Sequence, residues 1–108
     1  METLNELHDK VRLLDAAITQ LGKRGRSYAE AEQSYKIALA KKILTERDKG
    51  IPVTIISDIC RGDAEIARMR FERDCADVVY KSAMEAINSY KLQIRILDAQ
   101  IQREWNNA

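Results

Sequence analysis

Few residues in this 108-residue sequence have both the type and the spacing that chemistry requires. The single histidine, His8, lies between Leu7 and Asp9, one position outside a row of apolar residues, and is expected to be a solvated helix residue. The sequence contains no recognisable serine, histidine and aspartate set, no metal ligands at positions i and i+4, and no glycine-rich phosphate loop after a strand. We therefore expect no enzymatic activity, no catalytic residue, and no bound metal or cofactor.

The two cysteines, Cys60 and Cys75, form no Cys-x-x-Cys pair and have apolar neighbours. Such cysteines usually act as small hydrophobic residues in a reducing compartment rather than as disulfide or metal ligands. The sequence starts with Glu2 and Glu6 instead of a basic and then apolar stretch. No apolar run approaches the ~18 residues that a membrane span needs. The predicted location is the cytoplasm, without membrane association.

Lys23, Arg24 and Arg26 form the one cluster of basic residues, next to Gly22 and Gly25. Clustered cations are typical of phosphate contacts, so this cluster is the candidate contact for nucleic acid or for a protein partner. Elsewhere the charges alternate in sign, and 18 basic against 17 acidic residues give a net charge of +1. Nucleic acid is therefore an open alternative, but a solvated helix face is favoured.

The elements that position these residues are expected to be long helices, because only four glycines and one proline occur. Apolar residues recur along the first segment at alternating steps of three and four, as in helices that pack lengthwise: Leu4, Leu7, Val11, Leu14, Ile18 and Leu21. This row predicts one helix over residues 2–48. A kink or a break at residues 22–26 is the alternative, and a further alternative is that Gly22 and Gly25 serve close packing of two helices.

Gly50 and Pro52 are expected to end the first helix, the glycine by adopting a left-handed backbone. Residues 49–62 then form a connector with a short helix over residues 55–60. Thr54 is the predicted N-cap of the short helix, and Asp63 that of the next helix. The apolar residues of the connector are expected to cover the end of the helix pair: Ile51, Val53, Ile55, Ile56 and Ile59.

No glycine or proline occurs from Asp63 to Trp105, so residues 63–105 are predicted to form a second long helix. Cys75, Ala86 and Leu97 are spaced by eleven, a repeat typical of a nearly straight helix. We expect an antiparallel hairpin in which the numbers of facing residues add to about 111. The predicted fold is all-α: one domain, residues 1–108, built as a long coiled-coil-like helical hairpin. A three-helix bundle with a break at residues 22–26 is the alternative.

A second apolar row on the later helix has no partner within the predicted hairpin. We expect it to lie between the subunits of a homo-oligomer, a two-fold dimer being favoured, so that a multi-helix bundle forms. The residues of this predicted interface are Ile66, Met69, Ala76, Tyr80, Met84 and Ile87.

Five stretches carry a resemblance to known proteins: Ala-Leu-Ala-Lys-Lys-Ile at residues 38–43, Gly-Ile-Pro-Val-Thr at 50–54, Arg-Gly-Asp at 61–63, Arg-Phe-Glu-Arg-Asp at 70–74 and Arg-Glu-Trp at 103–105. With them, most of the chain resembles small uncharacterised helical proteins of bacteriophages and prophages. The resemblance implies a host-cell cytoplasm and a place among accessory genes, and it transfers no catalytic residue.

The expected function is a helical assembly or adaptor module that binds another, unidentified protein. The module itself is expected to be a phage-encoded accessory or host-factor-binding protein. The alternative is a nucleic-acid transaction accessory that uses Lys23, Arg24 and Arg26 to contact phosphates.

Overall fold

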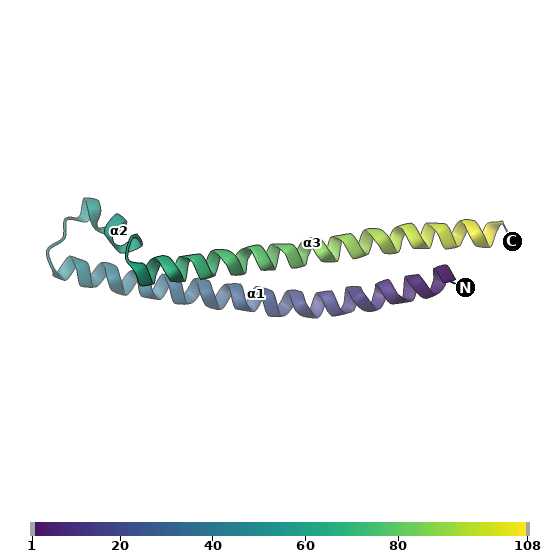
Figure 1. Cartoon of the computed structure of the whole chain (residues 1–108), viewed down its shortest axis with the longest axis horizontal. Helices are drawn as coiled ribbons and strands as arrows, with labels where there is room; N and C mark the ends of the chain where they lie inside the picture. The colour runs from purple at the N-terminus through teal and green to yellow at the C-terminus, as the bar shows by residue number, and fades with distance from the viewer. Residues whose placement is uncertain (1, 108) are drawn as a thin grey trace. The chain divides into compact units, whose positions relative to one another are not determined.

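The computed structural model describes residues 2–107, which contain three helices in the order α1 (Glu2–Asp48), α2 (Val53–Arg61) and α3 (Ala64–Asn106) (Figure 1). None of these described residues lies in a strand. The predicted all-α class is therefore confirmed. Helix α1 continues through residues 22–26, so the alternative of three helices separated by a break there does not form.

The chain divides into two compact units, each built from α1 and α3. The first contains the chain up to Arg24 and from Tyr80 onwards, and the second contains Gly25–Val79. In the first unit, Thr3 Oγ1 donates a hydrogen bond to Glu104 Oε1 over 3.2 Å. In the second, Tyr35 of α1 lies beside Arg73 of α3. Within each unit the two helices thus run antiparallel, as predicted for a hairpin (Figure 1).

The side of α3 that faces α1 carries a row of residues with heptad spacing, not the predicted eleven-residue repeat. Its less exposed side chains recur at alternating steps of three and four: Ile66, Met69, Arg73, Ala76, Tyr80, Ala83, Ile87, Tyr90, Ile94, Leu97 and Ile101. The eleven-residue row does not face inward throughout, because each step of eleven residues moves the row by about 20° around the helix and carries it across the edge of the inward face. Cys75 and Ala86 are exposed, whereas Leu97, in the same predicted set, is buried.

The predicted inward row of α1 is confirmed for half of its residues. Three residues of the predicted row are half-buried and share a spacing of seven: Leu7, Leu14 and Leu21. Leu4, Val11 and Ile18 lie at the edge instead, with exposed fractions of 38%, 40% and 50%. A helix has 3.6 residues per turn against 3.5 for the heptad row, so spacing alone does not fix which neighbouring position faces inward.

The connector differs from its prediction at two points. Helix α2 begins at Val53, and Thr54 therefore lies inside the first turn and does not cap it. The carbonyl of Pro52 accepts hydrogen bonds from the amides of Ile55 and Ile56 over 3.2 and 3.1 Å instead. The connector also covers less than predicted, because Ile56 is buried but Val53, Ile55 and Ile59 are exposed.

Two other connector predictions are confirmed. Gly50 has a φ of 85°, the left-handed conformation that ends α1. Asp63 Oδ2 accepts a hydrogen bond from the Ile66 amide over 3.3 Å and so caps α3. The predicted register of the two long helices is wrong, however. Lys42 Nζ lies 3.7 Å from Asp63 Oδ1, whereas facing residue numbers that add to about 111 would have placed Met69 beside Lys42. The end of α1 therefore extends past the start of α3.

Candidate functional site

The predicted basic contact lies on α1, and its three residues are exposed. Lys23 and Arg24 belong to the first unit and Arg26 to the second. Arg26 Nε donates a hydrogen bond to Glu30 Oε1 over 2.9 Å, one turn further along the helix. Both side chains are largely exposed, so this pair contributes little free energy, and it places an acidic side chain beside the basic cluster. The surroundings of Arg26 thus do not strengthen the nucleic-acid alternative.

The predicted subunit interface on α3 needs correction. Ile66 and Ile87 are only 4% and 7% exposed in the single chain, and Met69, Ala76 and Tyr80 are half-buried. These five residues belong to the inward heptad row and so form the core between α1 and α3. The remaining residue, Met84, is 36% exposed. The sequence contains two overlapping apolar rows on α3, and spacing did not reveal which of them faces α1.

A buried carboxylate in the second unit was missed by the sequence analysis. Glu46 is 7% exposed, and its Oε1 lies 3.1 Å from Lys42 Nζ and 3.3 Å from Lys49 Nζ. Hydrogen bonds from Lys42 and then Lys49 lower the pKa of Glu46. The hydrogen bond to Glu46 and then the charge of Asp63 raise the pKa of Lys42. The i,i+4 spacing of Lys42 and Glu46 was the available signal.

Arg73 is the one charged residue in the inward row of α3. Its guanidinium carbon lies 4.7 Å from the ring centroid of Tyr35, which is 6% exposed. Arg73 Nη2 also donates a hydrogen bond to Asp74 Oδ1 over 2.8 Å. A single polar residue in an apolar heptad row favours one register over others, because sliding would separate it from its partners. Arg73 therefore helps to fix how α3 pairs with α1 in the second unit.

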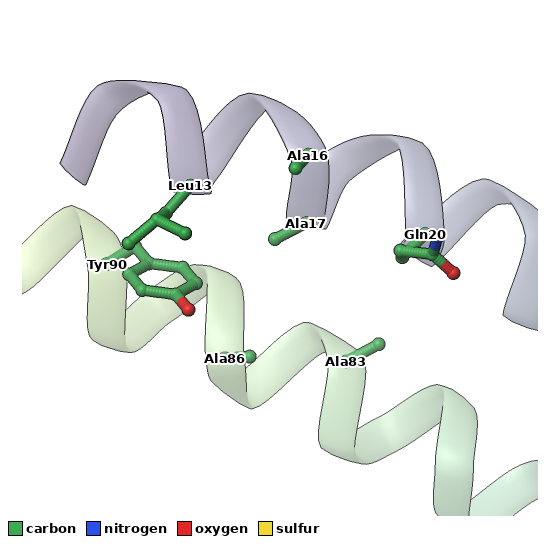
Figure 2. A pocket seen from close by; sticks show the side chains of 7 residues that line it. All are labelled: Leu13, Ala16, Ala17, Gln20, Ala83, Ala86 and Tyr90. Carbon is green, nitrogen blue, oxygen red and sulfur yellow. The ribbon is translucent and has the colours of Figure 1, made fainter. Parts of the chain in front are cut away.

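The first unit has a groove along one side of the helix pair (Figure 2). Its volume is about 270 Å³, and it is lined by Leu13, Ala16, Ala17 and Gln20 of α1 and by Ala83, Ala86 and Tyr90 of α3. Leu13 and Tyr90 lie together at one end, and the alanines leave the space between the helices open (Figure 2). Glu6, Lys10, Gln93, Ile96 and Leu97 line a further hollow of the same unit. The groove is apolar and shallow, so it suits another helix better than a small molecule.

Both cysteines are free thiols, but only one has the expected environment. Cys60 is fully buried, as predicted for a small hydrophobic residue, whereas Cys75 is exposed on α3. Cys75 lies in an apolar surface of the second unit together with Phe71, Val78 and Val79. Among residues 2–107, no three histidine, cysteine, aspartate or glutamate side chains are grouped as metal ligands would be.

Comparisons with known proteins assign no relative to this chain. No protein-family model matches the sequence, and neither a curated protein nor a solved structure shows significant similarity to it. In the part of the chain that the structure describes, no helix combines the length and the apolar character that crossing a membrane requires.

Proposed function

We propose that this protein is a non-enzymatic helical interaction module that binds a helix of another protein. We further propose that the protein acts in the cytoplasm of a bacterial host and is a phage-encoded accessory or host-factor-binding protein. That setting is supported by the sequence resemblance described above.

The observation that carries the proposal is the edge row of α1, which consists of Leu4, Val11 and Ile18. These side chains repeat every seven residues and remain 38–50% exposed beside the contact between α1 and α3 in the first unit. An apolar row with heptad spacing is what a further helix packs against, because one such residue recurs at every second turn. Covering this row removes apolar surface from water, at about 25 cal/mol per Å².

Capture of partners by the full-length protein and two matched variants tests this proposal. Ile18→Glu places a charge in the edge row, whereas Thr19→Glu, its neighbour, places the same charge on an exposed position outside it. Both replace a β-branched residue of one helix, so their effects on helix propensity are similar. The proteins are immobilised and incubated with an extract of the proposed bacterial host, with and without nuclease treatment, and the retained proteins are identified by mass spectrometry.

We expect a partner protein to be retained by the wild type and by Thr19→Glu but lost with Ile18→Glu. Retention through apolar contacts should change little between low and moderate salt. Retention that requires nucleic acid and falls steeply with salt would instead support phosphate contacts through Lys23, Arg24 and Arg26, and would overturn the proposal. Equal retention by all three proteins would also overturn it.

A further inference from the structure

We infer that the groove of the first unit binds a second copy of this chain, turned antiparallel so that α1 lies over α1 and α3 over α3. The inference rests on the proposed function and deepens it, because it names one partner of the interaction module. The groove lies on one side of the contact between α1 and α3, and the edge row of α1 lies on the other side. Self-association and partner binding therefore use different surfaces.

The distribution of charge around α3 is the first argument. On the groove side, from residue 82 to residue 100, the outer positions carry no charge: Ser82, Ala86, Ser89, Gln93, Ile96 and Gln100. On the opposite side of the same helix, the equivalent positions are mostly charged: Lys81, Met84, Asn88, Lys91, Arg95 and Asp98. Because 32% of all residues are charged, an exposed side without any charge is unusual. Depletion of charge is a mark of surfaces that become covered by protein.

The size of the groove residues is the second argument. Ala16 and Ala17 of α1 and Ala83 and Ala86 of α3 leave the groove open (Figure 2), and Ser82 and Ser89 continue the small outer side chains along α3. Helices approach most closely where both present small residues. With a two-fold axis between residues 86 and 89, Ala86 of each copy meets Ser89 of the other. Leu13 and Tyr90 then provide larger apolar contacts on either side of this crossing.

The order of charges along α1 selects the antiparallel arrangement. Its exposed groove-side row is acidic at one end, neutral in the middle and basic at the other end: Glu6, Asp9, Leu13, Ala16, Gln20 and Lys23. A second α1 that runs antiparallel and is centred on Ala16 brings Lys23 of each copy beside Asp9 of the other. Placing α1 over α3 would instead set these charges against uncharged residues of α3. The same contact occurs twice across the axis, so the assembly closes as a dimer.

Asp9 has a partner within its own chain, which does not prevent this contact. It pairs with Arg12, three residues along the helix, and both side chains are largely exposed. Exposed pairs of this kind contribute little free energy, so Asp9 remains available to a cation of the second copy.

Sedimentation equilibrium of the full-length protein tests the groove directly. Ala86→Glu places a carboxylate in the groove, and Asn88→Glu places it on the charged side of the same helix, two residues away. We expect the wild type and Asn88→Glu to be dimers. Ala86→Glu should raise the dissociation constant by roughly 100-fold, because two carboxylates are then desolvated at the crossing. Circular dichroism checks that the helix content of both variants is unchanged.

Charge reversal tests the predicted orientation of the second copy. Asp9→Lys and Lys23→Glu should each weaken the dimer, because each brings like charges together. The double variant, Asp9→Lys with Lys23→Glu, recreates opposite charges and should restore most of the association. Loss without rescue in the double variant would overturn the antiparallel arrangement.

The remaining outcomes separate this inference from the proposed function. A monomeric wild type, or a dimer that Ala86→Glu leaves intact, overturns the groove as the site of self-association. If partner capture still depends on Ile18 in that case, the proposed function stands without it. A dimer that depends on Ala86, combined with no partner capture by any protein, supports self-association and contradicts binding of a different protein.

Discussion

Glu46 shows at the scale of a residue how a thin helix pair accommodates a buried charge. A carboxylate removed from water is costly unless cations and hydrogen-bond donors surround it. Lys42 and Lys49 supply both, and Lys42 also lies within ion-pair distance of Asp63 at the start of α3. The cluster thereby links the end of one long helix to the beginning of the other.

We expect the stabilisation by Glu46 to be lost in acid. The lysines hold the pKa of Glu46 below its ordinary value of 4.5, and unfolding releases them. The contribution is therefore fully present above pH 4.5 and disappears as the pH falls through the folded-state pKa. Urea unfolding of the wild type and Glu46→Gln should show a difference in midpoint that is largest at neutral pH and shrinks in acid. A difference that is independent of pH would contradict this assignment.

At the scale of an element, two glycines of the first half of the chain have opposite roles. Gly22 lies inside α1, and a Cβ atom there would have no neighbour within 4 Å. Its suggested role in close packing is therefore wrong. Gly50 ends the same helix with a φ of 85°, a conformation that side chains with a Cβ rarely adopt.

We expect alanine to change stability in opposite directions at these positions. Gly22→Ala should raise the free energy of unfolding by about 1 kcal/mol, because alanine favours the helix interior and meets no atom. Gly50→Ala should lower it by about 1–2 kcal/mol, because alanine is strained at a positive φ. Thermal and urea unfolding measure both effects. Destabilisation by Gly22→Ala would mean that the helix there is packed more tightly than its environment indicates.

At the scale of the whole molecule, the question is which apolar residues hold the chain together and which remain for association. Ile87 is 7% exposed and belongs to the inward row, whereas Met84, three residues before it, is 36% exposed. Sequence spacing had assigned both to one interface between subunits. The structure separates them because Ile87 faces α1, whereas Met84 lies about 60° further around α3, at the exposed edge of the inward face.

Aspartate at these two positions should have different consequences. Ile87→Asp buries an unpaired carboxylate in the core and should cause loss of helix content in the isolated protein. Met84→Asp lies at the exposed edge opposite the groove, so it should leave both the helix content and the dimer through the groove intact. Circular dichroism and sedimentation equilibrium together check both expectations. A folded Ile87→Asp that has become monomeric would return this residue to the subunit interface.

Local sequence is sufficient to specify the helices, since helix formation depends on hydrogen bonds and caps within about one turn of each residue. The absence of glycine and proline predicted α3, and Gly50 and Asp63 marked the turn and the cap correctly. Tertiary structure alone decided which rows face inward, how far α1 extends past the start of α3, and that the first unit has an uncharged groove. Rotating or sliding a helix changes none of its internal hydrogen bonds. Its position is therefore set by contacts such as Tyr35 with Arg73 and Lys42 with Asp63, which join residues far apart in the chain.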